Sequence, residues 1–364
     1  MDKKPKLEVT EDIISQGKHI LLITPGFPKN EDDENCIPPL QDYARILAGD
    51  NERKVSVITL QYPAEKGCYD WFGIKVHSCG GNDTRFPKRL IIWNDAVRAF
   101  KTIYCNLSVD VIHSFWLSEC TLIGNYLSSK FRIKHFTTFM GKEISAPNHY
   151  LRFLKLKKLK IICLSNRQAD LLKRIGYSEL VIIPWGLIPD FIPTFKVEER
   201  KFDVIGVGSL IDIKNFSSFI NIIRIVKIFL PDIKCLIIGG GPLNNFLQSE
   251  IEESALDQNI TLTGELKRHQ VFEYMNKSKI LLHTSSFESF GMVFIEALYY
   301  GLHIVSKPIG IAWESDTWST CKSDHEMANE IIRILSFKVN YNSSIPYTMH
   351  KTVKSYLNIF FPPD

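Results

Sequence analysis

Residues 283–301, HTSSFESFGMVFIEALYYG, combine two carboxylates with a small polar loop and a glycine that precedes a helix-like run. We expect a strand to end where this segment begins and a helix to cover residues 290–300. The first backbone amides of a helix have no intrahelical acceptor and direct partial positive charge outward. Those of Phe290, Gly291 and Met292 could therefore hold an anion such as a diphosphate.

The two carboxylates belong to Glu288, ahead of the expected helix, and Glu296, inside it. A helical path between them would bring both to roughly the same side, where one ligand could meet both. A carboxylate suits sugar hydroxyls, because it accepts two or more hydrogen bonds that its charge strengthens. A capped core helix with two solvated acids fits the same spacing, so both interpretations stay open at this point.

Short apolar runs alternate with helix-length segments along both halves of the chain, a pattern typical of parallel sheets with crossover helices. In the first half we expect strands over 20–24, 54–59, 110–113, 135–138 and 161–165, and helices over 40–48, 92–104 and 117–128. In the second half we expect strands over 203–207, 234–238, 260–263, 280–283 and 303–305, and helices over 216–228, 243–254, 269–276 and 290–300. Each half is thus predicted to be a doubly wound α/β domain.

A length of 364 residues suggests two domains, since one domain takes roughly 150 residues. We assign residues 1–183 to the first domain and 203–346 to the second. Residues 184–202 read as a linker, because prolines and a glycine are followed by the charged run KVEERK. Residues 347–364 are expected to hold a helix that either caps the second domain or crosses back to the first.

The charge balance excludes some classes of protein. A net charge of +4 is too small a surplus to indicate nucleic-acid binding. The first residues lack the apolar core of a secretory signal, and the longest apolar runs are broken by charges. We therefore expect a cytoplasmic protein that does not cross a bilayer. The eight cysteines form no C-x-x-C pair, which predicts reduced, mostly buried thiols.

A basic run, LRFLKLKKLK over residues 151–160, stands out locally. Its cations would spread around most of a helix, so a clean membrane-lying amphipathic helix is not indicated. It is either a solvated helix or a surface for anionic lipid or a phosphate-bearing acceptor. Two glycine-rich turns, at 206–208 and 239–241, both lack the third glycine of a dinucleotide fingerprint. They are typical of sharp strand-to-helix turns.

The run ESFGMVFIEALYYG, from Glu288 to Gly301, resembles the signature of the family 4 retaining glycosyltransferases. VGSLIDIKNF resembles that family's phosphate-binding segment, IIGGGP its next strand and turn, and ITLTGEL its base-contacting segment. DVIH, CLS and IIPWG in the first half also fit, so the resemblance spans nearly the whole chain. It implies the GT-B fold, in which two Rossmann-like domains face each other across a cleft, the first binding the acceptor and the second the nucleotide sugar.

The resemblance also implies roles for particular residues. Glu296 would hold the ribose, Glu288 would contact the donor sugar, and Lys214 would neutralise the diphosphate as a compact charge. His113 completes the candidate catalytic set with Glu288 and Lys214; the alternative for His113 is a strand-end histidine satisfied by the backbone. The other candidate donor-binding residues are Gly26, Ser209, Leu266, Phe290, Gly291 and Met292.

Three departures from the family's pattern concern the same site. Ser209 stands where an arginine is usual, which removes a bidentate phosphate clamp; Lys307 or Arg268 could supply a replacement cation. Met140, in TFMG, stands where a histidine is common. The loop TPGFPKNEDDENCIPPL has one glycine, Gly26, in place of a pair, and its acids either bind acceptor hydroxyls or face water.

The implied activity is that of a retaining, metal-independent glycosyltransferase, moving a sugar from a UDP or GDP donor to a glycan or lipid-linked acceptor in polysaccharide or glycoconjugate synthesis. The donor is a substrate, so no cofactor is expected. The chain has no D-x-D motif for a metal. The alternatives are a nucleotide-sugar epimerase or hydrolase of the same fold, or a non-catalytic partner that binds nucleotide sugars. The basic run is compatible with peripheral contact at the inner membrane face.

Overall fold

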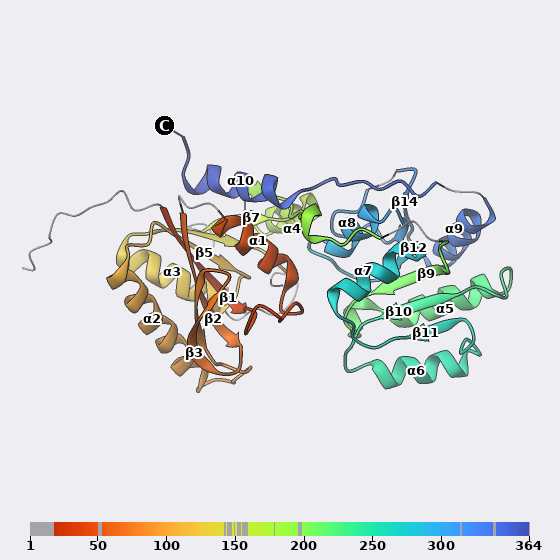
Figure 1. The fold of residues 1–364 in the computed structure, drawn as a ribbon, viewed down its shortest axis with the longest axis horizontal. Coiled ribbons are helices and arrows are strands. Elements are labelled where there is room, and N and C mark those ends of the chain that lie inside the picture. The colour runs from red at the N-terminus through yellow and green to blue at the C-terminus, as the bar shows by residue number, and fades with distance from the viewer. Residues whose placement is uncertain are drawn as a thin grey trace, which may run out of the picture.

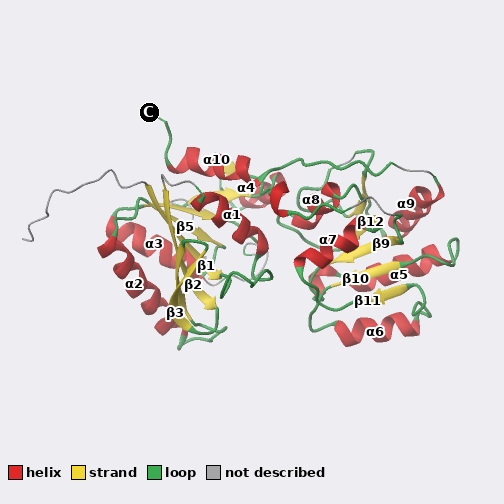
Figure 2. Ribbon diagram, in the orientation of Figure 1, coloured by secondary structure: helices red, strands yellow, loops and turns green. Residues whose placement is uncertain are grey.

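The computed structural model describes residues 18–49, 53–141, 143, 148, 150, 154, 159–177, 179–195, 199–313, 315–337 and 340–363. The chain forms two α/β units side by side, each a sheet with helices on both faces (Figure 1). The last helix leaves the second unit and lies on the first (Figure 2). The described residues therefore form the two doubly wound domains that the alternating pattern predicts.

The first sheet has the strand order β3-β4-β2-β1-β5-β6-β7-β8, with every pair parallel except the β3/β4 hairpin. Its central strand is a continuous apolar run, of which Ile20, Leu21, Leu22 and Ile23 are fully buried because helices cover both faces. The strands are β1 (Lys18–Gly26), β2 (Arg53–Tyr62), β3 (Lys66–Trp71), β4 (Ile74–Cys79), β5 (Val111–Phe115), β6 (Lys134–Thr138), β7 (Lys160–Cys163) and β8 (Leu180–Ile182).

The second sheet is parallel throughout, in the order β11-β10-β9-β12-β13-β14. Its strands are β9 (Phe202–Val207), β10 (Cys235–Ile238), β11 (Ile260–Leu262), β12 (Ser278–His283), β13 (His303–Ser306) and β14 (Trp318–Thr320). In a doubly wound sheet the carboxyl ends of the strands form the edge where ligands bind. The ends of β9, β10 and β12 are therefore the places to look for a site.

The crossover helices supply the layers on either side of each sheet. In the first domain these are α1 (Pro38–Ala48), α2 (Arg89–Asn106), α3 (Glu119–Phe131) and α4 (Asn166–Arg174). In the second they are α5 (Phe216–Lys227), α6 (Asn244–Glu253), α7 (Arg268–Asn276), α8 (Met292–Tyr299) and α9 (Asp324–Ser336). Helices α3, α4 and α9 begin at serines whose hydroxyls accept from first-turn amides, which satisfies donors left free at a helix start.

The C-terminal helix α10 (Met349–Phe360) crosses back to the first domain (Figure 1). Tyr356 is fully buried there, and its hydroxyl lies 2.9 Å from Thr138 Oγ1 and accepts from Trp185 Nε1 at 3.1 Å. The segment read as a linker is partly a packed element: Trp185 and Leu187 are buried, and Leu187 pairs by backbone hydrogen bonds with the approach to α10. Pro189 begins a short 3-10 helix over Pro189–Phe191, a position where a proline's missing amide costs no hydrogen bond.

All ten expected strands are present, together with strands and helices that the sequence reading missed, namely β3, β4, β8, β14, α4 and α9. Helix α8 is shorter than expected, because it begins only at Met292. Most of the basic run 151–160 lies outside the described residues; its last residue, Lys160, begins β7. Five of the eight free cysteines are buried. Among the described residues, no helix has the length and apolarity needed to span a membrane.

Candidate functional site

A cavity of about 370 Å³ lies between the two domains at the carboxyl ends of β9 and β10. The second domain provides most of its wall, including both glycine turns, the segment after β11 and the first turns of α7 and α8. The residues from that domain include Gly208, Ser209, Gly239, Gly240, Glu265, Leu266, Arg268, Met292 and Glu296; the first domain adds Asn35, Pro38 and Pro39. We call this the interdomain cavity.

The two glycine turns approach each other so closely that a side chain has no room. A Cβ added to Gly239 would stand 1.9 Å from the carbonyl oxygen of Gly208. A Cβ on Gly208 would meet the aliphatic stem of Lys214 at 3.4 Å. Bare backbone therefore forms this wall of the cavity, so a ligand can approach it closely, while the amides of Gly208 and Gly239 themselves donate to the carbonyls of Ile238 and Gly264 at 3.0 Å.

Glu296, on α8, faces a cation that the first domain holds in place. Arg268 Nη2 lies 3.8 Å from Glu296 Oε1, and the guanidinium donates two hydrogen bonds to Asp42 of α1, at 2.9 and 3.2 Å. Burial raises the pKa of Glu296, the Arg268 charge opposes that rise, and the Asp42 charge adds to it. A second bridge between the domains runs from Asn35 Nδ2 to Glu265 Oε1 at 3.0 Å.

Glu288, in the loop before α8, belongs to a different group of side chains. Its Oε1 accepts hydrogen bonds from Lys214 Nζ, from His283 Nε2 at 3.0 Å and from Ser285 Oγ at 3.2 Å. Burial alone would raise the pKa of Glu288, but the His283 hydrogen bond and the Lys214 charge lower it to about 2. This carboxylate is therefore ionised and locked by partners from its own domain.

Helix phase does not relate the two acids, because Glu288 lies outside α8. Glu288 instead lines a neighbouring cavity of about 320 Å³ with Arg167 of α4. Arg167 also donates to the carbonyl of Ala312 at 2.7 Å, so this cavity too lies between the domains. The expectation that both acids line one space is corrected: Glu288 and Glu296 line two different cavities. Lys214 lines neither of them; its carbons pass beside Gly208 and its ammonium pairs with Glu288.

Among the other candidate donor-binding residues, Ser209, Leu266 and Met292 line the interdomain cavity, while Phe290, Gly291 and Gly26 do not. Phe290 is buried, with its ring 5.9 Å from that of Tyr347. Gly291 has a φ of 91° and is packed under Phe294, where a Cβ would clash at 2.5 Å. Gly26 ends β1 beneath Cys36, which covers it.

His113 lies away from both cavities, contrary to the catalytic role expected for it. The side chain is fully buried under α10, with Nδ1 3.1 Å from the Tyr43 hydroxyl and Nε2 2.8 Å from Thr138 Oγ1. Burial lowers its pKa well below the usual value, so it is neutral. The side-chain partners, not the backbone, satisfy this histidine.

The three departures from the expected pattern also have a structural setting. Arg268, and not Lys307, lines the interdomain cavity together with Ser209. Beside Met140 lies a half-buried carboxylate: Glu143 accepts from the amides of Met140 and Gly141, at 3.2 and 2.7 Å. In the acidic loop, Glu31 and Glu34 line a small cavity of about 240 Å³ that shares Arg268 with the interdomain cavity.

Two residues of the site carry no marker that sequence reasoning could have used. His283 is the last residue of β12, and only the loop geometry brings it onto Glu288. Asp42 sits in the middle of α1, where its carboxylate would read as solvated, yet it is 5% exposed. Among the described residues, no cluster of three or more His, Cys, Asp or Glu could hold a metal ion.

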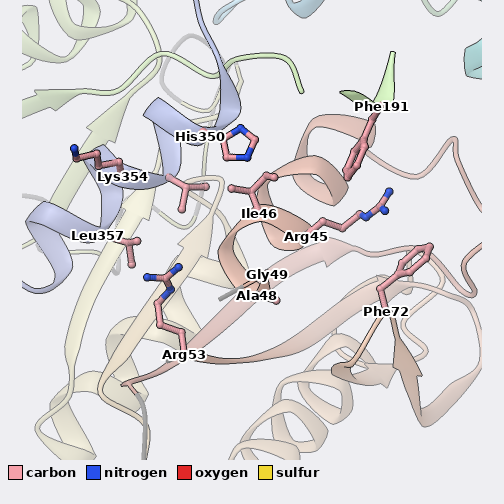
Figure 3. Close-up of a pocket in the computed structure, with 11 residues that line it drawn as sticks. Arg45, Ile46, Ala48, Gly49, Arg53, Phe72, Phe191, His350, Lys354 and Leu357 are labelled. Carbon is pink, nitrogen blue, oxygen red and sulfur yellow. The ribbon is translucent and has the colours of Figure 1, made fainter. Parts of the chain in front are cut away.

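A further cavity, of about 580 Å³, lies between α1 and α10 on the first domain (Figure 3). Its wall includes Arg53, His350 and Lys354, and Arg45 stands between the rings of Phe72 and Phe191. None of the residues selected from the sequence lines it. Ser209, Leu266, Met292 and Glu296 line the interdomain cavity, and Glu288 lines the other cavity between the domains.

Residues 189–338 match the family model described as glycosyl transferases group 1. A curated relative is the phosphatidylinositol N-acetylglucosaminyltransferase gpi3 subunit of Schizosaccharomyces pombe, 24% identical over 58% of this chain and 49% of its own length. Another is the protein of the same description, the GPI3 subunit, from Saccharomyces cerevisiae, 28% identical over 45% of this chain and 38% of its own. The matches thus span half or less of these two relatives.

Solved structures resemble the chain over nearly its whole length. Sucrose-phosphate synthase from Thermosynechococcus elongatus has a TM-score of 0.72 at 17% identity, covering 94% of this chain and 95% of that one. Anabaena HepE, solved with UDP and glucose, has a TM-score of 0.65 at 16% identity, with the same coverage. The chain therefore carries a glycosyl transferases group 1 domain over residues 189–338, within a GT-B fold of two facing Rossmann-like domains.

Proposed function

We propose that the chain is a retaining glycosyltransferase, which moves a sugar from a nucleotide diphosphate donor to a hydroxyl of a glycan or lipid-linked acceptor. The observation that carries the proposal is the make-up of the interdomain cavity. Two side-chain-free turns, at Gly208 and Gly239, let a diphosphate approach the backbone closely, and Glu296 stands at the same cavity to accept from ribose hydroxyls. The glycosyl transferases group 1 domain spans all of these residues.

In this proposal Lys214 stabilises the leaving diphosphate. The charge that develops on the β-phosphate when the sugar leaves can be met by a fixed ammonium without reorganisation. The ion pair with Glu288 fixes that ammonium at the end of a side chain whose carbons pass beside Gly208, from where we expect it to reach a diphosphate at this turn. The bond between the anomeric carbon and the phosphate oxygen breaks, the acceptor oxygen bonds from the same face, and the acceptor proton passes to the departing phosphate. No metal ion takes part in this scheme.

For the donor we propose UDP-N-acetylglucosamine as the first compound to test. The Schizosaccharomyces pombe and Saccharomyces cerevisiae relatives, and the 2-deoxystreptamine N-acetyl-D-glucosaminyltransferase of Niallia circulans, are all named as N-acetylglucosaminyltransferases. The Anabaena HepE structure contains UDP. Phosphatidylinositol, an acceptor class contained in two of these names, belongs in the acceptor panel with oligosaccharides.

The test incubates the purified chain with UDP-N-acetylglucosamine, UDP-glucose or GDP-mannose and the acceptor panel, followed by mass spectrometry. A glycosylated acceptor that retains the anomeric configuration of the donor supports the proposal. Altered free donor without acceptor product would indicate the epimerase or hydrolase, and binding without turnover would indicate the non-catalytic partner. Activity that persists in excess EDTA is expected, and its loss with rescue by added Mg²⁺ would contradict the metal-independent scheme.

A further inference from the structure

Arg268 occupies an unusual position, because it lines the interdomain cavity while its charge is committed to the opposite domain. Both terminal nitrogens donate to Asp42 of α1, in the paired geometry that makes Arg–carboxylate bonds strong. The Arg268 side chain is 20% exposed and that of Asp42 only 7%. Its Nε is buried and has no hydrogen-bond partner within the described part of the chain.

The same guanidinium faces the acid expected to hold the ribose. Arg268 Nη2, which donates to Asp42, also lies 3.8 Å from Glu296 Oε1, so the two carboxylates share one cation. Each carboxylate raises the energy of the other's ionised form, and Arg268 lowers both. Two more acids, Glu34 and Glu265, stand nearby: Glu34 adds to the field at Arg268, and Glu265 accepts from Asn35. His269 lies 3.9 Å from Glu34.

We propose that Arg268 is a positioning residue for the donor, which keeps Glu296 ionised for the ribose hydroxyls and is itself held by Asp42 of the first domain. The inference rests on the proposed function, because it assumes that Glu296 binds the ribose. It makes donor affinity depend on a contact between the domains. The acceptor domain would thereby influence donor binding through Asp42 of α1, which does not itself line the interdomain cavity.

Arg268 and Asp42 have opposite effects on the pKa of Glu296, and this distinguishes the proposed role from a purely structural one. Arg268→Gln removes the cation that faces Glu296, so ionisation of this acid is lost at a higher pH. Asp42→Asn removes a competing negative charge and leaves Arg268 to Glu296, so ionisation is lost at a lower pH. A purely structural bridge would instead give both variants the same defect, since each breaks the same contact.

The experiment measures donor affinity by calorimetry between pH 4 and 8, with UDP-N-acetylglucosamine and GDP-mannose as probes. Their diphosphates are esterified at both ends, so the ligand itself does not titrate over this range. We expect Arg268→Gln to weaken binding about tenfold at pH 7 and to move the acid midpoint roughly one pH unit higher, and Asp42→Asn to move it lower. Arg268→Lys should restore part of the affinity because it restores the charge.

Two controls separate the possible failures. Glu296→Gln should lose the acid midpoint altogether. Arg333→Gln removes an exposed arginine on α9, paired there with the half-buried Glu330, and should change nothing. Midpoints that move in the same direction in Arg268→Gln and Asp42→Asn, or do not move, would overturn this inference alone. Absence of binding to either probe by the unmodified chain would instead overturn the proposed function.

Discussion

The loop before α8 and the helix itself each contribute one carboxylate, and the two have different surroundings. Glu288 in the loop is bound to Lys214 and His283 of its own domain, and these partners lower its pKa to about 2 against the effect of burial. Glu296 in the helix has a raised pKa through burial, and the cation facing it is held by Asp42 of the other domain. The loop group, Glu288 with Lys214 and His283, lies within one domain. The helix group, Glu296 with Arg268 and Asp42, includes residues of both domains.

This difference suggests a division of work. Lys214 is paired with an ionised acid of its own domain, so its position does not depend on how the two domains are oriented. This suits the stabilisation of charge that develops in a reaction. An acid whose charge depends on an interdomain contact suits binding that responds to domain position. The predictions below test whether the loop group acts on turnover and the helix group on affinity.

The largest effect is expected for Lys214→Ala. If Lys214 stabilises the leaving diphosphate, its removal should lower kcat about 100-fold to 1,000-fold, the range for losing one fixed donor to a developing anion, while donor affinity falls much less. Steady-state kinetics with calorimetry would separate the two quantities. Lys322→Ala, at an exposed lysine of the same domain, is the matched control. A fall in donor affinity with an unchanged kcat would contradict the assignment of Lys214 and Glu288 to turnover.

The next largest effect is expected on the free energy of unfolding at acid pH, through Glu288 and its partners Lys214 and His283. The folded pKa of Glu288, about 2, lies below the ordinary value of 4.5, so its stabilising contribution is present above about pH 4.5 and is lost as the pH falls toward 2. This is worth at most about 3 kcal/mol. In denaturant titrations Glu288→Gln should therefore be less stable than the unmodified chain at pH 7, with the gap closing below pH 4. A gap that is constant with pH would count against an ionised, locked carboxylate.

Glu296→Ala should weaken nucleotide binding by roughly 10-fold to 100-fold, as expected for losing hydrogen bonds to a charged group. At saturating donor, kcat should change little, in contrast to Lys214→Ala. Calorimetry with UDP gives the affinity directly. Glu253→Ala, at an exposed acid of α6, serves as the control. Unchanged affinity in Glu296→Ala would remove this residue from the site.

The smallest effect is expected for His283→Gln. The amide can still donate to Glu288, so the loop keeps its hydrogen-bond pattern, and kcat should fall only a few-fold. His283→Leu cannot donate to Glu288, so Glu288 should hold Lys214 less firmly and kcat should fall further than in His283→Gln. Comparison of kcat for the two variants measures how much turnover depends on the hydrogen bond from residue 283 to Glu288. Equal and large losses in both would assign His283 a direct part in the reaction.

The alternating apolar pattern predicted ten of the fourteen described strands, because fully buried parallel strands read as continuous apolar runs. Strand β3 of the β3/β4 hairpin is largely exposed and carries little apolar signal, whereas β4 alternates between buried and exposed residues over only six positions, and both were missed. The C-terminal crossing was one of two open alternatives, and buried aromatic contacts such as that of Tyr356 with Trp185 are what distinguish them in the structure.

The candidate site was predictable where chemistry lies in one segment and less so where it depends on contacts distant in sequence. Ser209, Leu266, Met292 and Glu296 line the interdomain cavity as a group, because they follow the ends of neighbouring strands. The placement of His113 was wrong, because a strand-end histidine looks the same whether it is exposed or covered by a helix more than 200 residues later. Asp42 was missed for the same reason, since its partner lies in the other domain.

The most direct test of the account is a crystal structure of the chain with bound UDP. The account predicts the diphosphate against the Gly208 and Gly239 turns, within reach of Lys214, and the ribose hydroxyls within hydrogen-bond distance of Glu296. UDP bound elsewhere, for example in the cavity between α1 and α10, or a ribose turned away from Glu296, would contradict it.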